Sequence, residues 1–224
     1  FFERSWEQIL RMNPARRPFI VMIETWNELH EGTDICPSRE YGDQYVKLNA
    51  RYADMFRRKV HLRPQGAYST AREVSVIMER QPISRGLRPH VNPNGDGLME
   101  PAEVNGVAAW RTLPNRHHNM RFAYFDVDDS FYFDLGVPVQ IEVEVWDGEG
   151  AFSIEYDSAD RAGRPYEGAF KMAKAFTLGN TGRWRTFDVT VKDARFVGRA
   201  NGADFRLGSD RELLIRRVTV RKTQ

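Results

Sequence analysis

Apolar and polar positions divide the chain into two parts with different patterns. In residues 1–66, apolar side chains recur every three or four positions over 1–12 and over 41–60, which predicts two amphipathic helices. Between them, residues 19–23 (FIVMI) form a continuous apolar run, typical of a strand buried on both faces of a parallel sheet. A strand flanked by helices predicts an α/β arrangement for this part.

From residue 67 onward, the segments are short, alternate apolar with polar residues and are separated by turn sequences such as DGEG and GNTGR. The clearest alternation places Val139, Ile141, Val143 and Val145 on one face of a strand. The pattern predicts an antiparallel β-sandwich of the jelly-roll kind over residues 67–224. The predicted strands are 72–79, 120–127, 137–146, 151–157, 170–178, 184–191 and 212–220, with 203–207 as a further strand.

Composition excludes several classes of protein. A net charge of +2 gives no sign of nucleic-acid binding, and no apolar run approaches the roughly 20 residues of a membrane span. The one cysteine, Cys36, excludes an intrachain disulfide. Because the chain starts with FFERSW inside a helical pattern, we interpret it as a C-terminal fragment whose preceding segment is missing.

The residues after the apolar run, 24–34 (ETWNELHEGTD), are rich in groups that do chemistry. In sheets of parallel strands, function gathers at the carboxyl ends of the strands. Glu28 and Glu31 are three positions apart, and one helical turn would bring their Cβ atoms to about 5–6 Å. Such spacing suits the two carboxylates of a retaining glycosidase. A solvated surface turn and a metal site that adds His30 and Asp34 are the alternatives, although the sequence is not HExxH.

The neighbouring residues suit substrate binding. Trp26 can stack on the apolar face of a sugar, while Asn27 and His30 can form hydrogen bonds to its hydroxyl groups. On a strand, Glu24 and Trp26 share one face, so Glu24 can also touch substrate at a barrel mouth. A salt-bridged structural acid is the alternative for Glu24.

The stretch WNELHEGT resembles the end of the barrel in glycoside hydrolase family 99 and family 71-like proteins, where N-E-W-H-E-G-T closes the last catalytic strand. Leu29 departs from this pattern. The matching residues are Asn27, Glu28, His30, Glu31, Gly32 and Thr33. The resemblance implies that residues 1–66 are the last helix–strand–helix portion of a (β/α)8 barrel acting on α-mannosides or related glycans. It also implies that Glu28 acts as a base on a sugar hydroxyl, through an anhydro-sugar intermediate, and that Glu31 acts as acid and base on the leaving group.

The sandwich is expected to accompany this enzyme, because sandwiches attached to glycosidases are often carbohydrate-binding modules. TGRWRTFDVTV, residues 181–191, resembles a strand of galactose-binding-like jelly-roll modules. Trp184, with Trp146, Tyr156 and Tyr166, predicts a platform for stacking sugars. Burial of these aromatic residues in the core, in a sandwich with a purely structural role, is the alternative.

One segment raises the possibility of bound calcium. Asn92, Asn94, Asp96 and Glu103 follow the spacing of an EF-hand loop, with Asn in place of the first Asp. Pro101 lies inside the segment and its flanks are not helical in pattern, so an ordinary turn is the alternative. We predict no other metal or cofactor.

These patterns predict the C-terminal part of a retaining glycoside hydrolase with a sugar-binding or structural sandwich. Its expected partner is an oligo- or polysaccharide, met outside the cell or in the periplasm. We expect the isolated chain to be inactive, because the missing segment would supply most of the active-site wall. The alternative is a non-catalytic carbohydrate-binding or structural protein.

Overall fold

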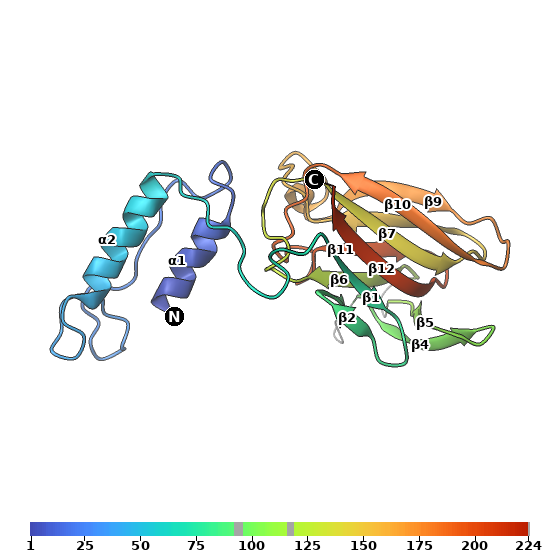
Figure 1. The fold of residues 1–224 in the computed structure, drawn as a ribbon, viewed down its shortest axis with the longest axis horizontal. Coiled ribbons are helices and arrows are strands. Elements are labelled where there is room, and N and C mark those ends of the chain that lie inside the picture. The colour runs from blue at the N-terminus through green and yellow to red at the C-terminus, as the bar shows by residue number, and fades with distance from the viewer. Residues whose placement is uncertain (92–95, 116–118, 224) are drawn as a thin grey trace. The chain divides into compact units, whose positions relative to one another are not determined.

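The computed structural model describes residues 1–91, 96–115 and 119–223. The chain forms two compact units, Phe1–Arg63 and Pro64–Gln224 (Figure 1). No helix in the described part of the chain is long and apolar enough to cross a membrane.

The first unit contains the two predicted helices, α1 (Phe2–Arg11) and α2 (Gln44–Arg57). They pack through a small core in which Trp6 stacks on Tyr52, with ring centroids 6.1 Å apart, and Leu10 lies beside them. Trp6 and Leu10 are four positions apart, so both lie on the same face of α1.

The predicted strand over residues 19–23 does not form. A strand needs hydrogen-bonding partners along its sides, and no described segment of this chain pairs with these residues. Val21 and Ile23 instead pack against the small helical core, whereas Phe19 and Met22 are 96% and 86% exposed. The expectation of a helix–strand–helix barrel portion is therefore wrong in its strand, and the unit consists of two helices joined by loops.

The second unit is an antiparallel β-sandwich, as the alternation predicts. In one sheet the strand order is β10-β7-β12-β1-β2, with β5 beside β12 and β4 beside β5; in the other it is β3-β6-β11-β8-β9. The strands are β1 (Glu73–Ile77), β2 (Ile83–Arg85), β3 (Leu87–His90), β4 (Met99–Val104), β5 (Val107–Thr112), β6 (Arg121–Val127), β7 (Val139–Trp146), β8 (Ala151–Tyr156), β9 (Lys171–Thr177), β10 (Trp184–Val191), β11 (Phe205–Ser209) and β12 (Leu214–Lys222). A short 3₁₀ turn, Tyr166–Gly168, precedes β9.

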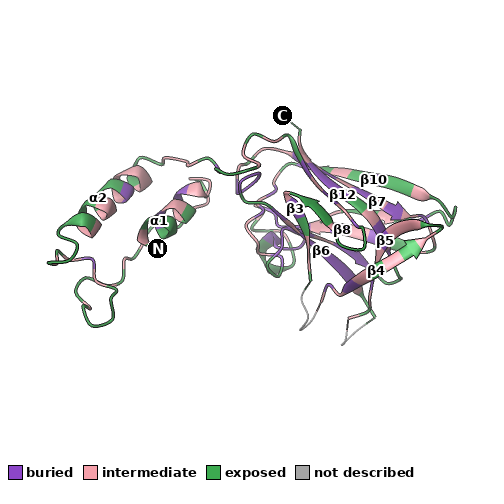
Figure 2. Cartoon of the chain, turned by 60° about the horizontal axis from the view of Figure 1, so that its bottom comes forward, coloured by how far each residue is buried: buried purple, intermediate pink, exposed green. Residues whose placement is uncertain are grey.

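Alternating residues of both sheets build the core between them (Figure 2). On β7, Val139, Ile141, Val143 and Val145 are fully buried, and the residues between them face outward. On β6, Phe125 is fully buried and stacks on Phe205 of β11 at 5.4 Å. Burial of each such side chain contributes roughly 1.5–3 kcal/mol, so these alternating residues are a main source of the stability of the sandwich.

Candidate functional site

The predicted catalytic residues lie on a closed loop of the first unit, residues 25–36, which we call the acidic loop. Its neck is held at Thr25 and Thr33, where the Thr25 amide donates to the Thr33 carbonyl at 3.2 Å and the two hydroxyl groups are 2.9 Å apart. The Trp26 carbonyl accepts hydrogen bonds from the amides of Ile35 (3.2 Å) and Cys36 (2.9 Å). These bonds fix both ends of the loop, so its tip is a defined turn.

At the tip, the Glu31 amide donates to the Glu28 carbonyl at 3.1 Å, which closes a tight turn. His30 lies between the two carboxylates, with Nδ1 3.5 Å from Glu28 and Nε2 3.8 Å from Glu31. One ligand atom from each of the three residues lies within 4.8 Å of the others. The spacing argument thus places both carboxylates together, but their catalytic role stays a prediction.

The geometry of this turn is compatible with three interpretations. All three side chains are exposed, by 44% for Glu28, 78% for His30 and 59% for Glu31. Two carboxylates with an imidazole can work on a sugar, and the same oxygen and nitrogen atoms can hold a divalent metal ion. Their exposure also fits a solvated surface turn.

The other predicted substrate-binding residues of this unit are divided between a pocket and the solvent. Glu24 lines a pocket of about 520 Å³, together with Trp6 and Met22. Trp26 is 58% exposed, and Asn27 is also exposed. Neither is among the described residues that line this pocket. The structure therefore brings Glu28, His30 and Glu31 together but does not gather all the predicted residues around one cavity.

In the sandwich, Trp146 and Trp184 face each other across neighbouring strands, and we call them the tryptophan pair. They are register partners on β7 and β10, and their rings meet edge to face with centroids 5.5 Å apart. The Arg216 guanidinium lies 6.0 Å from the Trp184 ring and pairs with Glu144 at 2.9 Å. The pair thus combines aromatic surface with charged hydrogen-bonding groups on the outer face of the sheet.

The predicted platform of four aromatic residues does not form. Tyr156 is only 3% exposed, and its hydroxyl donates to Asp193, so it belongs to the core. Burial, followed by the hydrogen bond to Asp193, raises the pKa of Tyr156. Tyr166 is 76% exposed and packs on Phe170, which covers the outer face of the other sheet. Tyr156 ends β8 and faces the core, whereas Tyr166 lies on the turn before β9, so the two side chains do not join the tryptophan pair.

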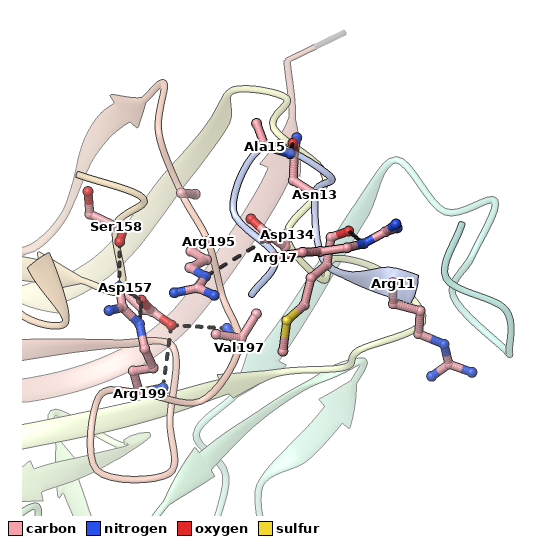
Figure 3. Close-up of polar contacts among 12 residues, drawn as sticks. Arg11, Asn13, Ala15, Arg17, Asp134, Asp157, Ser158, Arg195, Val197 and Arg199 are labelled. Atoms are coloured by element: carbon pink, nitrogen blue, oxygen red, sulfur yellow. Dashed lines mark hydrogen bonds and ion pairs between the residues drawn. The ribbon is translucent and has the colours of Figure 1, made fainter. Parts of the chain in front are cut away.

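The loops around Tyr166 are anchored by a buried ion pair that the sequence did not single out (Figure 3). Asp157 is fully buried and lies 2.7 Å from Nη2 of Arg199, and it accepts hydrogen bonds from Arg199 Nε (2.9 Å) and the Val197 amide (3.0 Å). Arg199 also donates to the Ser158 carbonyl. Such a satisfied buried pair holds two loops in one arrangement.

The calcium candidates are only partly within the described structure. Asn92 and Asn94 lie outside the described residues. The Asp96 carboxylate accepts hydrogen bonds from the Asn115 amide group and, at 3.2 Å, from the Tyr124 hydroxyl. Glu103 is exposed on β4, so the segment continues into a strand. Calcium binding stays a prediction.

A second pocket, of about 550 Å³, lies beside β2, β3 and β6 in the sandwich. Tyr68, Arg88, Asp126 and Asp128 are among its lining residues. Arg88 pairs with Asp126 at 2.6 Å, and Asp128 accepts a hydrogen bond from the Ser130 amide at 2.8 Å. These internal partners explain the charged groups as parts of the fold.

No family model matches the chain, and no curated protein matches it. Solved structures with some likeness include the CBM22-1 xylan-binding domain of Paenibacillus barcinonensis Xyn10C, with 12% identity, 73% of this chain and 99% of that chain covered, and a TM-score of 0.42. The K1 cleaved adhesin domain of Lys-gingipain from Porphyromonas gingivalis W83 is 12% identical, with 68% of this chain and 99% of that chain covered and a TM-score of 0.39. The family 29 carbohydrate-binding module CBM29_1 of Piromyces equi is 12% identical, with 66% of this chain and 90% of that chain covered and a TM-score of 0.35.

Structural similarity at this level is too low to carry an argument, so the fold is defined by the strand pairings described above. The solved structures named are carbohydrate-binding modules and an adhesin domain, and those names describe these proteins alone. The comparisons do not support the resemblance of residues 26–33 to glycoside hydrolase family 99.

Proposed function

We propose that the sandwich binds carbohydrate and that the tryptophan pair contacts the sugar. The observation that carries the proposal is the position of the pair. Val145 of β7 points into the core, so its neighbour Trp146 points away from it, and Trp184 lies directly opposite. Core packing therefore does not account for two large aromatic side chains at this place. An indole face binds the apolar face of a sugar, and charged groups such as Arg216 and Glu144 can bind its hydroxyl groups.

The competing explanation is that the pair only stabilises the sheet. Cross-strand aromatic pairs contribute roughly 0.2–1 kcal/mol relative to alanine pairs. That role predicts a small change in stability and no ligand, whereas sugar binding predicts a ligand that is lost with the ring. The two explanations therefore separate in a binding measurement.

The test uses the full chain on a glycan array, followed by titration calorimetry with each oligosaccharide that binds. We expect Trp184→Ala to weaken binding at the pair by tenfold or more, which corresponds to about 1.4 kcal/mol. Trp110→Phe is a matched control, because Trp110 of β5 uses its indole N–H for the Glu79 carbonyl at 2.7 Å and is not part of the pair. Absence of binding to every glycan, or wild-type affinity in Trp184→Ala, would contradict the proposal.

A second candidate is glycoside hydrolysis at the acidic loop. The observation that favours it is the approach of the Glu28 and Glu31 carboxylates to within 4.8 Å, close to the roughly 5–5.5 Å of retaining enzymes. In this proposal, residues 1–66 belong to a (β/α)8 barrel whose preceding segment supplies the strand partners that residues 19–23 lack here, and Glu24, Trp26, Asn27 and His30 bind the glycan. An extracellular or periplasmic setting would suit both candidates.

The test of this second candidate needs a parent protein that includes the rest of the barrel. There, Glu28→Gln and Glu31→Gln should each reduce turnover of α-mannosides by a factor of 10² or more, since each carboxylate is needed for a proton transfer. Glu40→Gln, an exposed acid in the following segment, is the control. Turnover near the wild-type rate in either variant would contradict the second candidate, whereas turnover by the 224 residues alone would contradict the expectation that the isolated chain is inactive.

A further inference from the structure

A second aromatic site lies on the outer face of the other sheet. On β6, Phe125 points into the core, so Phe122 and Tyr124 point away from it. They form a separate cluster on that face, which the segments before β9 and β11 cover with small and aromatic side chains. The covering residues are Ala169, Phe170, Ala200 and Ala203.

Arg206 of β11 is the centre of this cluster. Its guanidinium carbon lies 3.9 Å from the centroid of the Phe122 ring and 4.2 Å from that of Phe170. Oε2 of Glu155 accepts a hydrogen bond from Nε of Arg206 at 2.8 Å and forms an ion pair with Nη2 at 2.7 Å, and the Tyr124 hydroxyl accepts a hydrogen bond from Nη1 at 2.7 Å. The carboxylate oxygen and the two aromatic rings hold the guanidinium in place, so Phe170 rests on a rigid base.

Tyr166 packs on this base and is otherwise open to solvent. Its ring meets Phe170 edge to face at 6.0 Å, and the side chain is 76% exposed. Its backbone and that of Glu167 have φ angles of +52° and +53°. A bulky residue rarely adopts this conformation, and each such residue costs on the order of 1–3 kcal/mol.

The surrounding loop holds this conformation in place. The Gly168 carbonyl accepts a hydrogen bond from the Ser158 amide at 2.8 Å. Gly168 has a φ of +83°, and a Cβ atom there would lie 2.4 Å from the Asp160 carbonyl oxygen, so only glycine fits. Lys171 pairs with Asp160 at 3.0 Å on the same loop. The result is an exposed aromatic ring on a backbone that is held in one conformation before any ligand binds.

We infer that Tyr166 is a preorganised stacking surface for a pyranose ring, so that the sandwich binds glycans on both of its outer faces. The inference rests on the proposed carbohydrate binding, but it concerns a different face and different residues. A fixed ring loses little entropy on binding, which suits a ligand that offers mainly a flat apolar face. Met172 of β9 is the register partner of Glu155, which binds Arg206, and Met172 is 59% exposed, so it extends the apolar surface.

Calorimetry of the full chain with cellohexaose, xylohexaose and mannohexaose tests the inference. We expect two sites for at least one of these probes. Tyr166→Ala should remove one site or weaken it at least tenfold, whereas Trp184→Ala should affect only the other. Tyr166→Trp should retain both sites, because the stacking face is kept. The melting temperature of each variant checks that the fold is intact.

The outcomes separate the inference from the proposed function. If Tyr166→Ala keeps the stoichiometry and affinity of the wild type while Trp184→Ala loses binding, the inference is wrong and the proposed function stands. If Tyr166→Trp loses the same site as Tyr166→Ala, stacking is wrong as the mode of contact. If the wild type binds none of the three probes and no glycan on the array, the inference and the proposed function both fail.

Discussion

The two units of the chain differ in how they use their apolar side chains. The first unit buries Trp6, Leu10 and Tyr52, yet leaves Phe19 and Met22 almost fully exposed. In the sandwich, apolar residues from both sheets meet in one extended core. This difference shows that an apolar run alone does not ensure burial. Apolar side chains are buried only where another segment of the chain packs against them.

The same difference bears on the candidate sites. In the sandwich, Trp184 and Tyr166 stand on surfaces fixed by strand pairing and by the Arg206 cluster. In the first unit, Glu28 and Glu31 stand at the tip of an exposed loop. Preorganised side chains bind with a smaller entropic cost, so the sandwich is the better-built candidate for recognition.

The largest expected effect comes from removing a core side chain of the sandwich. Phe205 is fully buried and packs on Phe125 at 5.4 Å and on Phe196 at 6.1 Å. We expect Phe205→Ala to lower the free energy of unfolding of the sandwich by about 3–5 kcal/mol, because the lost contacts leave a cavity. Urea denaturation followed by circular dichroism measures the change.

Phe19→Ala is the matched control from the first unit, since the same side chain there is 96% exposed. We expect a change within about 0.5 kcal/mol, as for surface substitutions in general. A loss above 1 kcal/mol for Phe19→Ala would contradict the contrast between the units. So would a loss below 1 kcal/mol for Phe205→Ala.

How much of the fold could be predicted depended on whether the pattern was local. The alternation around Val143 predicts a strand with one buried face, and the spacing of Trp6 and Leu10 predicts a helix; both are confirmed. Strands β2 to β5 were missed, because they are three to six residues long and two contain a proline, Pro89 or Pro101. The prediction of a strand over residues 19–23 was wrong, because a local pattern does not provide neighbouring strands for hydrogen bonding.

The candidate sites follow the same rule. The turn that brings Glu28 to Glu31 spans three positions, so spacing was enough to predict their proximity. The Arg206 cluster joins residues as distant in sequence as Phe122 and Phe170, and no local signal marks them as neighbours. Tyr166 was noted as an aromatic residue, but the surface beneath it joins Phe170 to Arg206, and only the folded chain brings these residues together.

A smaller effect is expected at the turn between β9 and β10, where Asp147 holds the chain. This fully buried carboxylate accepts hydrogen bonds from the Gly179 amide and the Thr181 hydroxyl, both at 2.6 Å, and from Arg185 at 3.2 Å. Burial by itself would raise the pKa of Asp147, but the hydrogen bonds from Thr181, Gly179 and Arg185 outweigh it and lower the pKa to about 2.

The sandwich should therefore lose stability in acid through Asp147. Because the folded pKa lies below the unfolded value of 3.8, the stabilisation is fully present above about pH 4 and is lost as the pH falls toward 2. The shift corresponds to about 2 kcal/mol. Urea denaturation between pH 2 and 6 should show wild type more stable than Asp147→Asn by about this amount at pH 6, with the difference closing near pH 2.

Asp188→Asn is the control for this prediction. Asp188 is an exposed residue whose carboxylate accepts a hydrogen bond from Gln140 at 2.9 Å, and its substitution should leave the acid transition unchanged. A constant difference between wild type and Asp147→Asn across this range would show that the turn is held by packing and that the charge of Asp147 contributes nothing.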